Sequence, residues 1–471
     1  MAINIAIIGG GVAGVTTALT LGNLGLDVTL FEKKNALISG PPFCHLHAGG
    51  NLYREISTQA CVTLLKQSID FAKLYPFSID KRPTIFATPT YDPQEPLDLL
   101  PRLEVLRDEY KKLVEIDGSN KLLGEVEEYF EIFSKEQLLE LLKREIVKNP
   151  KSNEDWLITF AKNLDFSTIK FPVIVVQEYG INLFRVAANS GLALESMENV
   201  ELLRECEVVD IKESKEGFKL KFSGAKSAEK EFDYLINATG FQTGIIDDML
   251  GVKEQRMVEF KAAYTTKWEE RSGAWAEVVF HGIRGTNKGM GQWTPYCNGY
   301  VQLHAMTPDI TLFKDGLVKS TKDSSYPKLN KHFLDIIQNG WSQEELNRRS
   351  QRAINYLSHF FPSYKSAKIG TKPLFGAQQI PGDDPTLRVA EVAFPKEKYA
   401  RCEIVKVSSV NDMSKAIVED IAKYFKIDIK EDIFTIKELE KLEDKDIDKR
   451  ACEVAKKLGY PKDLGLRCNK F

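Results

Sequence analysis

The N-terminal segment constrains this chain more than any other, because residues 2–26 carry no charge. A stretch of this length can cross a bilayer as a helix, or it can lie buried within a folded domain. The β-forming run at residues 3–8 stops at three consecutive glycines, and a helical pattern begins after them. A signal peptide begins with basic residues, and none precedes Glu32. We therefore predict a buried strand, a glycine turn and a helix.

The turn has the spacing Gly9-x-Gly11-x-x-Gly14, which is typical of dinucleotide-binding βαβ units. Gly9 permits a tight turn, Gly11 lets the backbone approach a pyrophosphate, and Gly14 lets the helix pack closely against the strand. Val12 and Ala13 lie in the first helical turn, where the helix dipole favours phosphate. The predicted unit comprises residues 3–8, 12–24 and 27–31. A plain turn between strand and helix is the alternative interpretation.

An acidic residue follows the second predicted strand. Glu32 lies 18 residues after Gly14, where a carboxylate can accept both hydrogens of an unphosphorylated ribose diol. This position argues against NADP as the cofactor. The neighbouring Lys33 is included among the predicted cofactor contacts.

The glycine turn and the acidic residue together resemble the extended FAD fingerprint of flavoproteins with two dinucleotide folds. In those proteins a hydrophobic strand ending in Ala-Thr-Gly closes the FAD site far downstream, and residues 232–240 read FDYLINATG here. The resemblance implies FAD as the cofactor, with Thr239 and Gly240 at the site and the backbone of Val208 against the adenine. It also implies an α/β fold, in which a Rossmann-like two-dinucleotide-fold FAD-binding domain carries an inserted α+β substrate domain.

Three further segments resemble the D-amino-acid oxidase superfamily, in particular its glycine and sarcosine oxidase members. Residues 42–54 read PFCHLHAGGNLYR and are similar to a segment that passes along the flavin ring. Residues 372–378 and 381–385 are similar to a later region, in which the usual arginine is either replaced by Lys372 or displaced. The resemblance implies an FAD-dependent oxidoreductase that oxidises a small amine, amino acid or 2-hydroxy acid by hydride transfer to flavin N5.

The same resemblance places His45 and His47 beside the flavin ring, where a neutral imidazole can accept a proton from the substrate. Both are candidate catalytic residues, and His47 is also a candidate flavin contact. Either can instead satisfy a loop backbone group, or alternatively carry the flavin covalently. Arg54 is the third catalytic candidate, because guanidinium binds a substrate carboxylate through two hydrogen bonds. Arg284 is a second candidate for this contact, with a solvated surface position as the simpler interpretation.

The last cofactor element of the superfamily is a strand followed by a helix whose N-terminus points at the flavin. Residues 403–407 and 413–425 are similar to this pattern, although the usual glycine is absent. Asn411 or Asp412 is the predicted N-cap and a candidate cofactor contact. The helix dipole would support negative charge on the reduced flavin.

The predicted domains are interleaved along the chain. Within the substrate domain we expect an amphipathic helix at residues 125–148 and strands at residues 275–281 and 299–306. The charge-rich C-terminal part is expected to form surface helices that act as a cap or an oligomer contact. The FAD-binding domain comprises residues 1–94, 166–245 and 366–425, the substrate domain residues 95–165 and 246–365, and a small helical extension residues 426–471.

Composition excludes several other classes of protein. The chain has 471 residues with 64 Lys and Arg against 67 Asp and Glu, so it lacks the basic excess that nucleic-acid binding requires. Seven cysteines form no Cys-x-x-Cys pair, and we expect neither a thiolate metal site nor a disulfide framework. These observations favour a cytoplasmic protein with a small-molecule substrate, without a metal site or a transmembrane segment.

The sequence leaves the electron acceptor and the class of activity open. The acceptor is oxygen or a quinone, and a quinone-linked dehydrogenase resembling malate:quinone oxidoreductase would dock peripherally on the inner face of a membrane. A flavin-binding scaffold without catalytic activity and a dehydrogenase that uses only nicotinamide are also compatible with the motifs.

Overall fold

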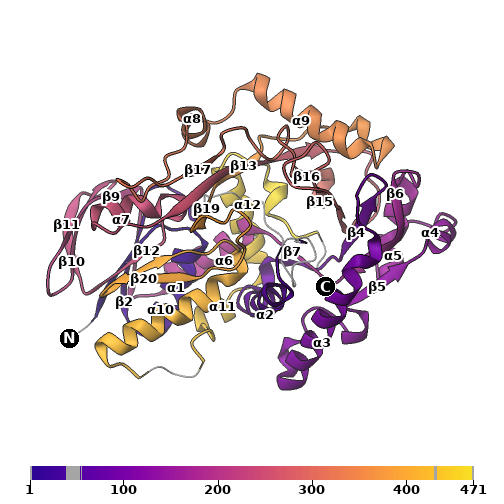
Figure 1. The fold of residues 1–471 in the computed structure, drawn as a ribbon. Coiled ribbons are helices and arrows are strands. Elements are labelled where there is room, and N and C mark those ends of the chain that lie inside the picture. Colours follow the sequence, from indigo (N-terminus) through magenta and orange to yellow (C-terminus); the bar gives the residue numbers. More distant parts are fainter. Residues whose placement is uncertain (1–2, 39–53, 55, 429–431, 469–471) are drawn as a thin grey trace.

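The computed structural model of the protein describes residues 3–38, 54, 56–428 and 432–468. Two large β-sheets of different character organise these residues (Figure 1). One has six strands and is almost wholly parallel, and the other has ten strands and is mostly antiparallel. The glycine turn belongs to the first sheet.

The six-stranded sheet has the order β20-β21-β12-β1-β2-β8, and all neighbours except β20 and β21 run parallel. Its strand β1 is apolar throughout its buried part, because each of its two faces packs against other chain segments. Ile5 and Ile7 pack among helices, whereas Ala6 and Ile8 pack against a second, three-stranded sheet. The six strands are β1 (Asn4–Ile8), β2 (Asp27–Glu32), β8 (Val200–Arg204), β12 (Tyr234–Asn237), β20 (Val392–Lys396) and β21 (Tyr399–Cys402).

Helices cover one face of this parallel sheet, and the three-stranded sheet covers the other. The helices are α1 (Val12–Asn23), α6 (Leu183–Ser196) and α10 (Val410–Phe425). The small sheet consists of β9 (Cys206–Glu213), β10 (Phe218–Gly224) and β11 (Ala228–Phe232). Phe31 of β2 anchors it, since its ring centroid lies 5.0 Å from that of Phe222 and 5.9 Å from that of Phe232.

The ten-stranded sheet has the order β17-β13-β16-β15-β14-β4-β6-β5, and β18 and β19 also pair with β13. β14 and β4 run parallel, and the other pairs are antiparallel. Its strands are β4 (Thr84–Pro89), β5 (Phe130–Phe133), β6 (Ile169–Val176), β13 (Arg256–Lys267), β14 (Glu277–Phe280), β15 (Gly291–Pro295), β16 (Tyr300–Ala305), β17 (Leu317–Lys319), β18 (Lys368–Ile369) and β19 (Leu374–Pro381).

The two faces of the ten-stranded sheet differ in polarity, because side chains alternate along each strand. Tyr264, Trp293 and Leu303 lie on the face covered by α9 (Gln343–Ser358) and form an apolar core with it. The opposite face carries buried polar side chains, such as Gln292 and Thr265. The apolar residues of this second face belong to the same core as α1 and α6, so its polar residues look toward the parallel sheet.

The remaining helices are shorter or lie at the periphery, and one minor two-stranded sheet joins β3 (Ile79–Asp80) to β7 (Gly180–Ile181). The helices are α2 (Thr58–Leu74), α3 (Leu100–Ile116), α4 (Lys135–Leu141), α5 (Asn153–Asn163), α7 (Thr243–Met249), α8 (Lys331–Asn339), α11 (Lys437–Glu440) and α12 (Asp444–Lys457). Among the residues that the structure describes, no helix is both long and apolar enough to cross a bilayer.

The single helix predicted at residues 125–148 is wrong. A 3-10 turn (Val126–Glu128), β5 and the short helix α4 occupy this stretch. β5 pairs with β6, with Ile132 opposite Ile174. The helical spacing of apolar residues did not reveal this pairing, because it depends on a strand more than 35 residues away.

The expectation that the cysteines form no disulfide is also wrong. Cys297 and Cys468 form a disulfide, with their Cα atoms 5.2 Å apart. Their separation of 171 residues gives no local motif, so sequence spacing could not reveal the pair. Cys206 and Cys402 are buried free thiols.

The predicted division into domains remains a proposal. Sheet pairing adds one refinement to it, because β4, β6 and β19 belong to the ten-stranded sheet, whereas the predicted limits assign them to the FAD-binding domain. In the proposed division these strands are therefore better grouped with the substrate domain.

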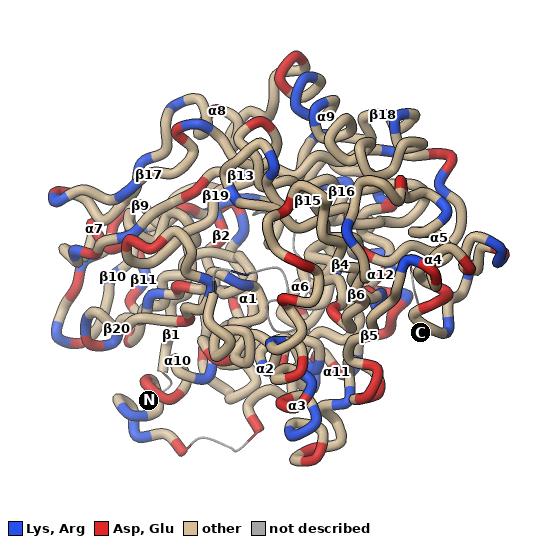
Figure 2. Tube along the Cα trace, turned by 45° about the vertical axis from the view of Figure 1, so that its right-hand side comes forward, with Lys and Arg blue, Asp and Glu red and all other residues tan. Residues whose placement is uncertain are grey.

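Lys and Arg are mixed with Asp and Glu along the whole trace (Figure 2).

Candidate active site

A cavity of about 360 Å³ opens beside the carboxyl ends of β1, β2 and β12. Ligands bind at this edge in open α/β sheets, because loops leave the sheet there and helix N-termini point toward it. The cavity is lined by seven of the predicted cofactor contacts, namely Gly9, Gly11, Glu32, Lys33, Val208, Thr239 and Gly240. Val208 lies on β9, and Thr239 and Gly240 follow β12.

The three glycines of the turn have different surroundings. A Cβ atom on Gly9, whose φ is +106°, would lie 2.5 Å from the carbonyl oxygen of Ala238. A Cβ on Gly14 would lie 1.9 Å from the carbonyl oxygen of Gly9, so this glycine is required by the packing of helix on strand. A Cβ on Gly11 would meet no atom of the described residues within 4 Å. Packing among the described residues therefore does not require glycine at position 11.

Helix α1 begins directly at this turn with no side-chain cap on its N-terminus. Its first residues are Val12, Ala13 and Gly14, whose N–H groups have no acceptor four residues earlier within the helix. An uncapped N-terminus of this kind suits a phosphate group.

Glu32 is held in place by the backbone. Its carboxylate accepts hydrogen bonds from the N–H of Gly10 at 2.8 Å and of Lys34 at 2.7 Å. Burial raises the pKa of this carboxyl, while the two N–H groups oppose that shift. Because each carboxylate oxygen has a second lone pair, Glu32 can still accept hydrogen bonds from a ligand in the cavity.

The prediction that Asn411 or Asp412 caps a helix is wrong, as is the strand predicted at residues 403–407. The strand β21 ends at Cys402, and α10 begins at Val410 with Ser409 at its N-cap position. Asn411 and Asp412 lie in the first turn and contact α2 instead: Asn411 Nδ2 donates to the Asp70 carbonyl at 3.1 Å, and Gln67 donates to Asp412 at 2.9 Å. Neither residue lines the cavity.

Of the three catalytic candidates, His45 and His47 lie outside the described residues. Arg54 is described, and its Nη1 atom forms an ion pair with Asp92 at 2.9 Å. Its Nη2 atom lies 2.7 Å from Nδ1 of His281. The guanidinium therefore already has a carboxylate partner, which the sequence did not reveal.

Arg284 belongs to a second buried cluster, which lies on the polar face of the ten-stranded sheet. Its Nη2 atom forms an ion pair with Glu259, and its buried Nη1 atom has no hydrogen-bond partner among the described residues. Lys261 Nζ lies 2.7 Å from Glu259 and donates to Gln378 at 2.9 Å. Two cations thus share one carboxylate, and the cluster carries a net positive charge when Lys261 is protonated.

Burial governs the titration of this cluster. It lowers the pKa of Lys261 to about 8, against the attraction of Glu259. Burial also opposes ionisation of Glu259, but Lys261 and Arg284 outweigh it and keep the pKa of Glu259 below its ordinary value. A buried charge without a matching opposite charge costs free energy. Ionisable groups with shifted pKa values are common at functional sites.

The cluster borders the cavity through β19. Lys261 on β13 is paired in register with Gly376, and Phe375, Gly376 and Ala377 line the cavity. Sequence reasoning missed Glu259 and Lys261, although two charged residues within the otherwise apolar run of β13 were a usable signal. Leu458 and Tyr460 also line the cavity, and no local signal marked them.

Residues 4–140 match the model of the FAD dependent oxidoreductase family. No curated protein sequence matches the chain. A glycine oxidase from Geobacillus kaustophilus has a similar structure, with a TM-score of 0.58 and 12% identity over 92% of this chain and 99% of that one. An L-amino acid deaminase from Proteus vulgaris gives 0.56 and 12%, over 93% and 97%.

An L-alpha-glycerophosphate oxidase from Mycoplasma pneumoniae with FAD bound gives a TM-score of 0.56 and 14% identity, over 89% of this chain and 95% of that one. At these identities the structural likeness shows the fold. Residues 4–140 thus match the FAD dependent oxidoreductase family, and the fold of the whole chain is similar to that of these three enzymes.

Proposed function

We propose that the protein oxidises a small amine, amino acid or 2-hydroxy acid, with a carboxylate-bearing substrate favoured, and holds its FAD non-covalently. The observation that carries this proposal is the buried cluster of Arg284, Lys261 and Glu259, because its net positive charge lies against the β19 wall of the cavity. An anionic group of a substrate would neutralise that charge.

The residues around the cavity fit FAD. The open space beside Gly11 and the uncapped first turn at Val12, Ala13 and Gly14 suit a pyrophosphate. Glu32 can accept hydrogen bonds from a ribose, with Lys33 beside it. Gly9, Thr239 and Gly240 would let the chain approach the cofactor closely, and Val208 would contact the adenine. These roles are proposed because all four residues line the cavity. When bound, FAD supplies the acceptor for a hydride from the substrate.

On the substrate side, we assign recognition of the carboxylate to Arg284 and Lys261. Arg284 has a buried Nη1 donor free of described partners, and Lys261 adds a second charge at short range. Arg54 is engaged by Asp92 and His281, so we propose that it positions His281 and does not bind the substrate. His45 and His47 remain the proposed proton acceptors.

The neighbouring structures support an anionic substrate by their chemistry. They are a glycine oxidase, an L-amino acid deaminase and an L-alpha-glycerophosphate oxidase, and glycine, L-amino acids and glycerophosphate each carry a carboxylate or a phosphate. The acceptor of the electrons is proposed to be oxygen or a quinone. A quinone acceptor would place the protein at the inner face of a membrane, and oxygen would suit a location in the cytoplasm.

The test is anaerobic bleaching of the purified yellow protein. We expect faster bleaching by some members of a panel of amino acids and 2-hydroxy acids than by the matching amines and alcohols that lack a carboxylate. Reoxidation by oxygen or by a soluble quinone then identifies the acceptor. A colourless protein, or a yellow protein that no compound bleaches, would contradict the proposal and favour a nicotinamide enzyme or a flavin-binding scaffold.

A further inference from the structure

The C-terminal segment from α12 to Cys468, which we call the strap (residues 444–468), reaches the FAD cavity. Leu458 and Tyr460 of the strap line the cavity. Lys372 Nζ donates to the carbonyl of Leu458 at 2.6 Å, and the Tyr460 hydroxyl donates to the carbonyl of Pro373 at 2.8 Å. Lys372 also lies 4.5 Å from the centre of the Tyr460 ring. The strap thus lies against the chain that leads into the β19 wall.

One end of the strap is anchored on α6 of the parallel-sheet layer. Arg185 is fully buried and forms ion pairs with Asp444, at 2.5 Å, and with Asp448 of α12. Near the opposite end of the strap, Asn182 at the start of α6 also donates to the carbonyl of Leu464 at 2.7 Å. These ion pairs explain part of the charge-rich sequence of α12. One face of this helix pairs with α6, so its charged residues do not serve only as a solvated surface.

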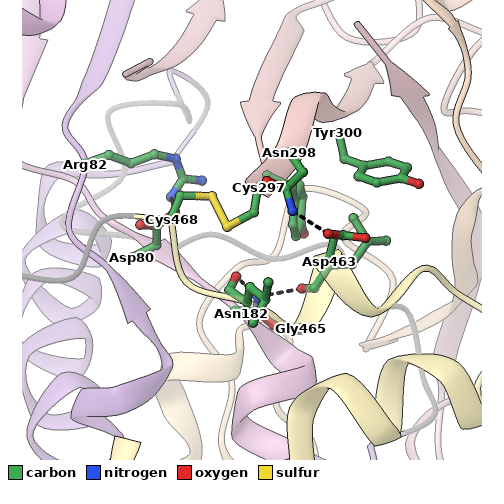
Figure 3. The surroundings of a disulfide bond; sticks show 12 residues. Asp80, Arg82, Asn182, Cys297, Asn298, Tyr300, Asp463, Gly465 and Cys468 are labelled. Carbon is green, nitrogen blue, oxygen red and sulfur yellow. Dashed lines mark hydrogen bonds and ion pairs between the residues drawn. A yellow bond between two sulfur atoms is a disulfide. The ribbon is translucent and has the colours of Figure 1, made fainter. Parts of the chain in front are cut away.

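The other end of the strap is anchored on the ten-stranded sheet. Figure 3 shows the disulfide from Cys468 to Cys297, together with the hydrogen bond from Asn298 to Asp463 beside it. Cys297 lies in the connection between β15 and β16. The strap therefore joins the two large sheets of the molecule, and its middle portion borders the cavity.

We propose that the strap closes one side of the FAD site and that the Cys297–Cys468 disulfide keeps it closed, so that reduction of the disulfide loosens bound FAD. In the reduction, a dithiol gives two electrons and two protons to the disulfide. The S–S bond breaks, two protein thiols form, and the dithiol becomes a disulfide. The strap then keeps its hydrogen bonds, its ion pairs and its apolar packing against residues such as Phe184 and Leu374. Segments without a covalent tie open more often than covalently tied ones.

The inference rests on the proposed occupancy of this cavity by FAD, and it is independent of which substrate is oxidised. If the inference holds, the protein retains FAD more firmly under oxidising conditions than under reducing conditions. The relevant quantity is the rate at which FAD leaves the full-length protein, which does not depend on turnover.

The main experiment measures FAD release from the full-length holoprotein by the rise of free-flavin fluorescence, with and without dithiothreitol. We expect release to be about fivefold faster or more after reduction, a change of about 1 kcal/mol or more in the release barrier. Cys468→Ser should release FAD at the fast rate under both conditions. Cys452→Ser, which changes a free cysteine on α12, should behave as the unchanged protein does.

Thiol titration of the unfolded protein gives a second, independent measurement. Because Cys297 and Cys468 form a disulfide, two more thiols should titrate after reduction than before it, and this difference should vanish in Cys468→Ser, in which the one thiol of Cys297 titrates under both conditions. The same number of thiols before and after reduction of the original protein, or the same FAD release rate with and without dithiothreitol, would overturn the proposal.

Replacement of Tyr460 separates the strap from its redox control. Tyr460→Ala should speed FAD release with or without dithiothreitol, whereas Tyr424→Ala on the exposed side of α10 should not. Unchanged release in Tyr460→Ala would show that the strap does not contribute to the FAD site. If the purified protein contains no FAD, the proposed function fails, and if it contains FAD with equal release rates, only this inference fails.

Discussion

At the scale of single residues, glycines at the same motif serve different requirements. Gly14 is required by contact between the helix and the turn, because a Cβ there would overlap the carbonyl oxygen of Gly9 at 1.9 Å. Gly11 has an extended backbone with φ of −71° and open space in place of its Cβ. A ligand that approaches the backbone here would account for glycine at position 11.

This contrast predicts that two alanine substitutions affect different properties, FAD binding in one case and stability in the other. Gly11→Ala should leave the stability of the FAD-free protein within about 1 kcal/mol of the original, but weaken FAD binding by about tenfold or more, which is about 1.4 kcal/mol. Gly14→Ala should lower the free energy of unfolding by about 1–3 kcal/mol through overpacking. Thermal unfolding without FAD and flavin titration measure the two effects. Equal loss of stability in both variants would contradict the distinction.

Lys261 gives a second prediction at this scale, which concerns pH. With a pKa lowered to about 8, Lys261 is cationic below that pH and neutral above it, so the cluster with Arg284 and Glu259 loses its net positive charge as pH rises. Binding of acetate can be followed through the visible flavin spectrum. As the pH rises through about 8, acetate should bind about tenfold more weakly, a free-energy change smaller than the full attraction between two nearby charges.

In Lys261→Met this pH dependence should disappear, and acetate should bind weakly throughout. Arg284→Met should weaken binding at every pH and keep the dependence. If Lys261→Met showed the same pH dependence as the original protein, another group would be responsible and the assignment of Lys261 would be wrong.

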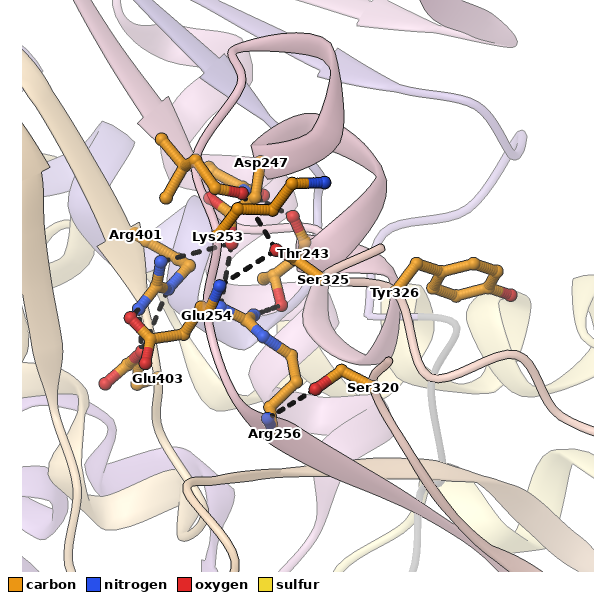
Figure 4. A network of polar contacts seen from close by, with 12 residues as sticks. Thr243, Asp247, Lys253, Glu254, Arg256, Ser320, Ser325, Tyr326, Arg401 and Glu403 are labelled. Atoms are coloured by element: carbon orange, nitrogen blue, oxygen red, sulfur yellow. Dashed lines mark hydrogen bonds and ion pairs between the residues drawn. The ribbon is translucent and has the colours of Figure 1, made fainter. Parts of the chain in front are cut away.

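At the scale of secondary-structure elements, a buried polar network ties α7, β13 and β21 together (Figure 4). Asp247 of α7 is fully buried and accepts hydrogen bonds from Arg256 at 2.7 Å and Arg401 at 3.1 Å. Tyr399 also donates to it, at 2.6 Å. Since β21 belongs to the parallel sheet and β13 to the ten-stranded one, this one carboxylate helps hold the two sheets together behind the cavity.

Removing this charge should be costly, because two guanidinium groups would stay buried without it. Asp247→Asn should lower the free energy of unfolding by about 3–5 kcal/mol. Glu254→Gln is the matched control, since Glu254 pairs with the same Arg401 but is 40% exposed, and it should cost about 1 kcal/mol or less. Urea unfolding followed by circular dichroism measures both. Similar losses in the two variants would contradict a central role for Asp247.

The elements also show where local sequence patterns predict the structure correctly and where they do not. β1, α1 and β2 lie within a residue or so of their predicted limits, because strand, turn and helix signals are all local there. The predictions failed at residues 125–148 and at Asn411, where pairing with β6 and contacts with α2 decide the local structure. Tertiary contacts outweigh weak local preferences in such segments.

At the scale of the whole molecule, the site forms where two sheets built from interleaved chain segments meet. The cavity takes residues from the N-terminal turn, from β9, from β19 and from the strap. The cationic cluster comes from β13 and the loop after β14. Charges of both signs are mixed along the chain trace (Figure 2), and the proposed substrate recognition depends on the buried cluster of Arg284, Lys261 and Glu259.

The sequence by itself determined the βαβ unit, its glycine turn and the acidic residue after β2, because these features depend on neighbours a few residues apart. It also pointed to FAD through the motif that ends at Gly240. Only the tertiary structure decided that Arg54 is paired with Asp92, that Lys261 and Arg284 share Glu259, and that the C-terminal strap reaches the cavity. Those contacts join residues far apart in the chain, and burial and charge pairing at such distances leave no periodic trace in the sequence.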